Sequence, residues 1–347
     1  MKDNTNRNLA YDVLRIISAI SIIVMHISSG SVYSLSLGSA SWSEAVIINS
    51  ISHFGVPVFV MISGALFMHP DKKIDMKRLW IHNILRMFVV FLVWSFIYGF
   101  LDHLSYRGGI RELLWSCVIS RNHLWFLPMI IGIYIILPIL IRWVRNAEAK
   151  EIRLFILLFF IFQVICETLN ACEFAEIITV ALDYRNIEIV CSYVGYFIIG
   201  YYITHIGLSK KVRITLYLLG FLGCISGIAA VFVLSIKRQI PAVSIVDSFS
   251  VFTFLYSTAL FTFISECFGK KEYKGKIPIF ISNVSKDTLG LYLCHLLIIE
   301  RAALFGNIYE SMPVIPGVLF YTAVICIIGL GGSALIRRIP FAGRYIC

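Results

Sequence analysis

Apolar residues along this chain gather into long runs that are separated by short polar connections. We count ten runs close to the length of about 17–25 residues that an α-helix needs to cross a bilayer. The predicted spans are residues 10–29, 46–68, 84–101, 123–141, 154–170, 187–206, 213–235, 248–268, 279–299 and 315–336. This pattern predicts an all-α polytopic membrane protein in which residues 1–347 form a single membrane domain.

Charge alternates from one connection to the next, and this alternation predicts an orientation. Lys and Arg collect before the first run and after the second, fourth, sixth, eighth and tenth runs, whereas the other connections are relatively acidic. Because cytoplasmic loops carry the excess of positive charge, we expect both termini in the cytoplasm. The connection 102–122 is the exception, since it places Arg107, Arg111 and Arg121 on the outer side.

Composition supports a membrane protein and argues against several other classes. Hydrophobic residues make up 59% of the chain and charged residues 14%, whereas a typical soluble domain has about 25% charged residues. Positively charged cytoplasmic loops explain the net charge of +10 better than nucleic-acid binding does. The chain has no CxxC, HExxH, Walker or GxSxG pattern, so we expect no disulfide framework and no metal site.

Three ionisable residues in the first run carry its strongest chemical signal. Asp12 and Arg15 stand at its start, and His26 follows Arg15 at a spacing that places both on one helical face. With a rise of about 1.5 Å per residue, His26 lies roughly 16 Å deeper than Arg15. Ionisable residues within a span are costly and usually face a protein interior or a wet cavity, so this face is the first candidate site. From the residues alone, an interfacial histidine at a helix end is an equally good explanation of His26.

The second and third runs contain further candidates. Pro57 is expected to kink the second helix, and Ser63 with Gly64 forms a small pair for which close helix packing is the simpler interpretation.

Three cations, Lys77, Arg78 and Arg86, stand at the start of the third run. Cations at this mouth can hold the phosphates of a nucleotide-like ligand. Ordinary positive-inside charge is the alternative, and it explains Arg86 less well because an apolar stretch follows that residue.

Two later runs add histidines and aromatic residues. His123 and Trp125 stand at the outer end of the fourth run, where Trp125 fits an interfacial aromatic belt. Tyr292 and His295 lie deeper in the ninth run, three residues apart and therefore on one helical face. A histidine in the middle of a span favours a polar partner over a lone core position.

Five segments, in this order, resemble the acyltransferase-3 family of integral membrane acyltransferases. Asp12, Arg15 and His26 resemble its Arg-x10-His signature, and FGVPVFVMISGALF resembles its second-helix segment. Its later segments are similar to NILRMFVVFLVWS, NHLWFLPMIIGIYIILPIL and SKDTLGLYLCH. The resemblance covers nearly the whole chain, which looks like the stand-alone polysaccharide or enterobacterial-common-antigen O-acetyltransferase type. Asn83 departs from the family, where this position is often Arg or Lys.

The resemblance implies a reaction and its partners. An acyl-CoA, usually acetyl-CoA, would act as a co-substrate from the cytoplasm and acylate a hydroxyl of an envelope glycan or lipid-linked glycan at a bacterial cell membrane. The family's pattern implies His26, Arg15 and Asp12 as catalytic residues, Arg86, Arg78 and Lys77 as donor-binding residues, and Ser63, Gly64, His123, Trp125, Tyr292 and His295 as lining residues. His26 would act as a general base or form an acyl-histidine, and the sequence leaves both open.

A second function from another class remains open. The membrane half of the vancomycin-resistance serine racemase has a similar membrane part and is associated with serine uptake. A transporter of serine or of an acylated glycan is therefore the alternative, with Arg15 and His26 lining its path.

Overall fold

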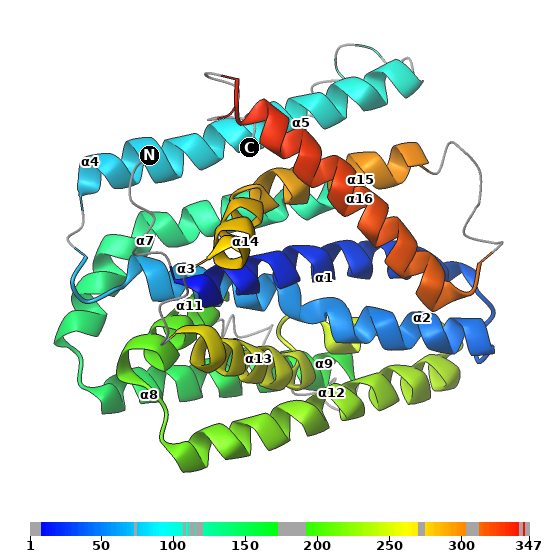
Figure 1. Cartoon of the computed structure of the whole chain (residues 1–347). Coiled ribbons are helices and arrows are strands. Elements are labelled where there is room, and N and C mark those ends of the chain that lie inside the picture. Colours follow the sequence, from blue (N-terminus) through cyan, green and yellow to red (C-terminus); the bar gives the residue numbers. More distant parts are fainter. Residues whose placement is uncertain are drawn as a thin grey trace. The chain divides into compact units, whose positions relative to one another are not determined.

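The computed structural model describes residues 8–72, 75–106, 121–172, 192–269, 275–302 and 312–339, together with the single positions 109, 111, 115 and 343. Every regular element within these ranges is a helix (Figure 1), which confirms the predicted all-α polytopic class. Eight helices of the described residues are long and apolar enough to cross a membrane: Leu9–Ser34, Ala40–Phe67, Met76–Leu104, Asn122–Asn146, Ala149–Ala171, Lys210–Arg238, Val243–Gly269 and Val314–Ile336.

The two remaining predicted spans differ from the other eight. Residues 187–191 of the sixth lie outside the described residues, and its remainder falls in the shorter apolar helix Val194–Ile206. The ninth, 279–299, is divided at Asp287 between α14 (Lys276–Lys286) and α15 (Thr288–Ala302). Asp and Thr side chains compete for backbone hydrogen bonds and so favour helix ends, which an apolar run does not reveal. The number ten, the cytoplasmic termini and the single domain stay predictions.

The chain divides into two compact units, which we describe separately. The first contains Met1–Pro70, Ala147–Lys286 and Gly306–Val324, and the second contains Asp71–Asn146, Asp287–Phe305 and Ile325–Cys347. The last helix, α16 (Val314–Ile336), contributes residues to both. The predicted site residues are therefore distributed over two units.

The first unit is built around α1 (Leu9–Ser34), which contacts α2, α3, α13 and α14. Its other elements are α2 (Ala40–Ile51), η1 (Ser52–Phe54), α3 (Gly55–Phe67), α8 (Ala149–Phe159), η4 (Phe160–Ile165), α9 (Cys166–Ala171), α11 (Val194–Tyr201), η5 (Tyr202–Ile206), α12 (Lys210–Arg238), η6 (Val243–Val246) and α13 (Val251–Gly269). Helices α12 and α13 run side by side (Figure 1). The central position of α1 buries much of the face that carries the candidate residues.

Glycines set the closest helix contacts of this unit. A Cβ added to Gly64 of α3 would overlap the backbone carbonyl of Phe197 in α11, and one added to Gly200 of α11 would overlap that of Met61 in α3. On α12, a Cβ added to Gly220 or Gly227 would overlap the side chain of Ala259 or Phe252 in α13. Small residues let helices approach in this way inside a membrane, so the packing interpretation of Gly64 is sufficient to explain it.

The second predicted span is interrupted before its proline. The 3-10 turn η1 separates α2 from α3, and Pro57 follows in the first turn of α3. Proline has no N–H to donate to the carbonyl four residues earlier, which for Pro57 is that of His53. The irregular backbone therefore lies one turn before Pro57, and it places His53 at the break.

The second unit contains the remaining described helices. They are α4 (Met76–Arg78), the π-helical turn η2 (Leu79–Ile84), α5 (Leu85–Tyr106), η3 (Asn122–Trp125), α7 (Phe126–Asn146), α15 and the second part of α16. Arg121 precedes η3 and lies 2.7 Å from the Asp102 carboxylate and 3.0 Å from that of Glu300. Two carboxylates thus neutralise Arg121, one of the three arginines in the connection 102–122 that did not fit the positive-inside rule. Arg111 is exposed, and Arg107 lies outside the described residues.

Candidate functional site

The polar start of α1 is held by an ion pair and by a hydroxyl from α14. Arg15 Nη1 lies 3.4 Å from Asp12 Oδ1, one helical turn away, as the sequence spacing allows. Ser285 Oγ donates to the same oxygen at 2.8 Å. Asp12 is 1% exposed, whereas the Arg15 side chain is 28% exposed. The buried carboxylate is therefore fixed from two sides, and the guanidinium keeps an accessible surface.

His26 is half-buried three turns farther along α1. Ala19 and Ile22, which lie between Arg15 and His26 on this face, are both buried. The His26 imidazole interacts electrostatically with His53, which stands at the break in the second span. The structure thus places a second histidine beside the one that the sequence indicated.

A buried amide connects His53 to α1. Asn49 of α2 is 1% exposed, and the two hydrogens of its Nδ2 are shared among three acceptors: the Met25 carbonyl at 3.0 Å, Ser28 Oγ at 3.0 Å and Ser29 Oγ at 3.1 Å. Its Oδ1 faces His53 Nε2 at 3.2 Å. Since an amide oxygen only accepts, this geometry requires the proton of neutral His53 to be on Nε2. Asn49 therefore fixes both the tautomer of His53 and the turn of α1 next to His26.

The other nitrogen of His53 faces a carboxylate. Nδ1 lies 3.7 Å from Asp247 Oδ1, which is longer than a hydrogen bond and suits an ion pair when His53 is protonated. The Asp247 side chain is 69% exposed, so water weakens this attraction. The Tyr256 hydroxyl contacts the carbonyls of Ser50 and Ile51 at 3.3 and 3.2 Å and ties α13 to the same break.

Sequence reasoning missed Asn49, His53 and Asp247. A signal was present for the first two, because an amide and an imidazole four residues apart share a helical face within an apolar run. Asp247 is almost two hundred residues away in the sequence, so no local pattern connects it with His53. The packing of η6 against α2 and of α13 against η1 brings the two together.

Ser63 does not offer its hydroxyl to a site in this structure. Ser63 Oγ donates to the Phe59 carbonyl of its own helix at 3.0 Å. The α11 backbone fills the space that a side chain at Gly64 would need. Nearby, His205 Nε2 contacts the Ala65 carbonyl at 2.8 Å. The geometry of this stretch is that of a packed helix pair.

The three predicted donor-binding cations lie in the second unit. Lys77 and Arg78 are exposed on α4, and Arg86 is half-buried on α5. The π-helical turn η2 separates Arg78 from Arg86, so α-helical spacing does not place these two on one face. Partial desolvation of the ammonium and the nearby charge of Arg78 lower the pKa of Lys72. Arg78 and Lys72 therefore lie close enough to repel each other.

The four remaining predicted residues also belong to the second unit, and three of them form one buried cluster. The exposed fractions of His123, Tyr292 and His295 are 2%, 7% and 0%. His123 Nε2 contacts the Leu293 carbonyl at 3.3 Å, the Tyr292 hydroxyl donates to the His123 carbonyl, and His295 Nδ1 contacts the Tyr292 carbonyl at 2.5 Å. Trp125, in contrast, is 43% exposed.

A tyrosine that the sequence did not single out completes this buried cluster. The Tyr98 hydroxyl donates to the Leu293 carbonyl at 2.9 Å and accepts from the Leu297 N–H at 3.2 Å, so it is inserted into the backbone ladder of α15. The His123 and His295 rings lie 5.1 Å apart, edge to face. These contacts join α5, η3 and α15, which is the arrangement of a structural core.

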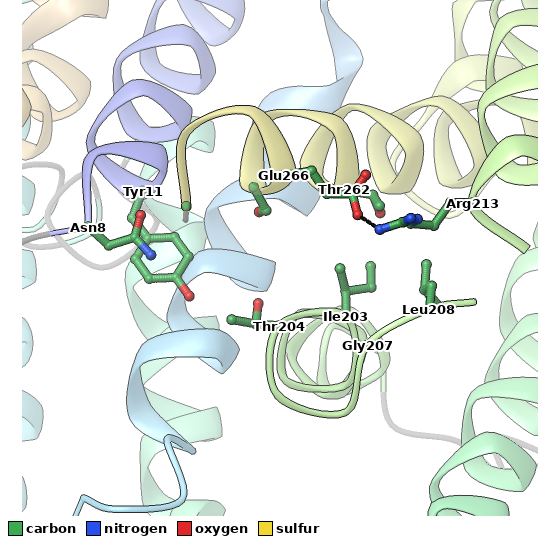
Figure 2. A pocket seen from close by; sticks show the side chains of 11 residues that line it. Asn8, Tyr11, Ile203, Thr204, Gly207, Leu208, Arg213, Thr262 and Glu266 are labelled. Carbon is green, nitrogen blue, oxygen red and sulfur yellow. Dashed lines mark hydrogen bonds and ion pairs between the residues drawn. The ribbon is translucent and has the colours of Figure 1, made fainter. Parts of the chain in front are cut away.

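The first unit also contains a cavity beside the start of α1 (Figure 2). Its volume is about 270 Å³, and its lining includes Asn8 and Tyr11 of the first helix together with Arg213 and Glu266. Tyr11 precedes Arg15 by one turn on the same face of α1. Within the part of the chain that the structure describes, no group of three or more His, Cys, Asp or Glu residues is arranged to hold a metal ion.

Comparisons with known proteins give one match. The model of the acyltransferase 3 family, described as an acyltransferase domain, matches residues 8–337. Comparison with curated proteins and with solved structures gives no significant match.

Proposed function

Because this chain belongs to the acyltransferase 3 family, we propose that it is a membrane O-acyltransferase that moves an acetyl group from cytoplasmic acetyl-CoA to a hydroxyl of an envelope glycan or lipid-linked glycan. The observation that carries this proposal is the face of α1. A fixed Asp12–Arg15 pair and a half-buried His26 share that face in a chain whose family match is nearly complete. We place the reaction at a bacterial cell membrane.

The proposed step transfers one acyl group and one proton. The acceptor oxygen attacks the thioester carbon while His26 takes the hydroxyl proton. The tetrahedral intermediate then loses the thiolate of coenzyme A, which takes the proton from His26, so an ester and a free thiol are formed. Imidazole suits this exchange because its ordinary pKa is near neutrality.

The surroundings of His26 support its role as the base. A general base acts best when neighbouring groups fix its position, and Asn49 fixes the adjoining turn of α1 through Met25, Ser28 and Ser29. His53 lies close enough to interact with any positive charge that forms on His26. We assign His53 and Asn49 as positioning residues.

Donor recognition is assigned to two charged regions. Arg15 keeps an accessible guanidinium beside the proposed path, and Asp12 orients it. Arg86, Arg78 and Lys77 carry the cations that phosphates of coenzyme A require. The repulsion between Arg78 and Lys72 is consistent with an anion at this segment.

The experiment that tests the proposal measures acetyl transfer in membrane vesicles that hold the protein and an extract of envelope glycans. Labelled acetyl-CoA should give a labelled glycan ester, and His26→Ala should reduce the rate by about 10²–10⁴-fold, the usual contribution of a general base. His26→Ala protein at normal abundance with undiminished transfer would contradict this mechanism. Counterflow of serine without acetyl-CoA would instead favour the transporter.

A further inference from the structure

The cavity beside the start of α1 lies within the first unit and has walls from four elements. These are α1, η5, α12 and α13, with intervening residues, and the lining residues are Asn8, Tyr11, Ile203, Thr204, Gly207, Leu208, Arg213, Thr262, Ser265, Glu266 and Gly269. Its volume of about 270 Å³ is slightly below the about 300–1,000 Å³ of pockets that enclose a whole drug-sized ligand. The cavity therefore fits a segment of a larger molecule.

Charge within the cavity is balanced. Arg213 forms an ion pair with one oxygen of Glu266, and the Tyr217 hydroxyl donates to the other oxygen at 2.9 Å. Figure 2 shows the Arg213–Glu266 pair at one side of the cavity, away from Tyr11. Because the charges of the lining residues compensate each other, this cavity suits an uncharged polar group better than a phosphate.

Two hydroxyl groups in the lining lack hydrogen bonds. Thr204 Oγ1 and Ser265 Oγ are inaccessible to solvent, and neither has a partner of normal geometry among the described residues. The Tyr11 ring points toward Thr204 in Figure 2, and the Tyr11 hydroxyl interacts with Thr204 outside normal hydrogen-bond geometry. A buried hydroxyl without a partner is costly, so a ligand that supplies amide or hydroxyl groups would gain from both.

The position of the cavity along α1 links it to the proposed reaction. Tyr11, Arg15 and His26 lie on one face, and the rise of about 1.5 Å per residue places Tyr11 roughly 22 Å from His26. Along α1, Arg15 lies between the cavity and His26, so a donor held here would have its far end directed past Arg15. The segment in the cavity is then remote from the reacting end of the donor.

We propose that this cavity binds the phosphate-proximal part of the pantetheine arm of the acyl donor. That part of the arm carries a hydroxyl and amide groups and no charge, which matches the balanced charges and the unpartnered hydroxyls of Thr204 and Ser265. This inference rests on the proposed acyltransferase function and adds a second donor subsite, separate from the phosphate-binding cations.

The test measures ligand binding to the detergent-purified full-length protein by thermal unfolding. The probes are coenzyme A, pantetheine, which lacks the nucleotide, and adenosine 3′,5′-bisphosphate, which lacks the arm. Pantetheine should raise Tm, because a ligand that binds only the folded state stabilises it. Thr204→Val and Ser265→Ala should each raise the Kd for pantetheine about fivefold, the loss expected for one neutral hydrogen bond.

Matched variants separate a lost contact from a damaged fold. Thr204→Ser keeps the hydroxyl and should restore binding. Ser226→Ala removes a hydroxyl that bonds only to the backbone of its own helix, α12, and should leave binding unchanged. The Kd for adenosine 3′,5′-bisphosphate should not respond to Thr204→Val, whereas Arg86→Ala should weaken it.

The outcomes distinguish this inference from the function on which it rests. If coenzyme A binds and His26→Ala blocks transfer, but pantetheine binds Thr204→Val and Ser265→Ala as tightly as the native protein, the cavity assignment is wrong and the function stands. If no probe raises Tm and His26→Ala has no effect on transfer, the function itself is wrong. Binding of pantetheine that both substitutions weaken supports the subsite.

Discussion

Two groups of histidines in this protein have different surroundings. In the first unit His26 is half-buried, and the His53 side chain is 10% exposed and faces an accessible carboxylate and a buried amide. His123 and His295, in the second unit, are 2% and 0% exposed and contact backbone carbonyls. Histidines that exchange protons need access to a substrate, whereas histidines that join helices need burial. We therefore expect the first pair to serve the reaction and the second pair to hold helices together.

The sharpest test of this comparison is to remove one imidazole from each group. We expect His295→Ala to lower the free energy of unfolding by about 2–4 kcal/mol, because it leaves a cavity and removes a hydrogen bond from a buried core. His26→Ala should change it by less than about 1 kcal/mol, since that side chain is half-buried, while it slows acetyl transfer by about 10²–10⁴-fold. Denaturant unfolding gives the free energy of unfolding of both variants, and a transfer assay gives their acetyl-transfer rates. The reverse pattern would reverse the two assignments.

A smaller effect is expected at the tyrosine that is inserted into α15. Tyr98→Phe removes the hydroxyl between the Leu293 carbonyl and the Leu297 N–H and should cost about 1–2 kcal/mol of stability. Tyr33→Phe, on the exposed end of α1, is the matched control and should cost less than about 0.5 kcal/mol. Thermal unfolding in detergent compares them. Equal Tm values for the two variants would contradict the proposal that the buried cluster around Tyr98 stabilises the fold.

The amide that joins His53 to α1 should matter for both activity and stability. Asn49→Ala leaves the His53 Nε2–H without its acceptor, and we expect transfer to fall about tenfold through kcat, with KM for acetyl-CoA unchanged. Stability should fall by about 1–3 kcal/mol because buried partners of Asn49 lose their donor. Ser52→Ala removes a nearby hydroxyl that donates to the Ile48 carbonyl of α2, and it is the control. An Asn49→Ala enzyme with normal kcat would exclude the positioning role.

The smallest effect is expected at the exposed carboxylate. Asp247→Asn removes a charge that lies 3.7 Å from His53 Nδ1 but is mostly in water, so transfer should change by less than about threefold. The rate measured at low and at high salt checks this, because salt screens an exposed pair. A hundredfold loss would instead place Asp247 among the catalytic residues.

The sequence predicted the parts of this molecule that depend on local spacing. Helical periodicity was sufficient to pair Asp12 with Arg15, and apolar runs located eight of the ten expected spans among the described helices. Residues that depend on tertiary packing escaped prediction. Ser285 reaches Asp12 from α14, and Asp247 reaches His53 from a segment remote in the sequence. The division of the ninth run falls in the polar stretch Lys286–Asp287–Thr288, which the prediction passed over because apolar residues on both sides complete a span-length run.

The reciprocal glycine contacts of α3 and α11 constrain how this protein can move. Gly64 admits the Phe197 backbone and Gly200 admits the Met61 backbone, so each helix carries a notch that receives the other. Sliding one helix along its partner by a single residue would force a side chain into a notch. Helices α3 and α11 therefore resist sliding along each other. We expect them to move together, as one rigid element, in any rearrangement during a catalytic cycle.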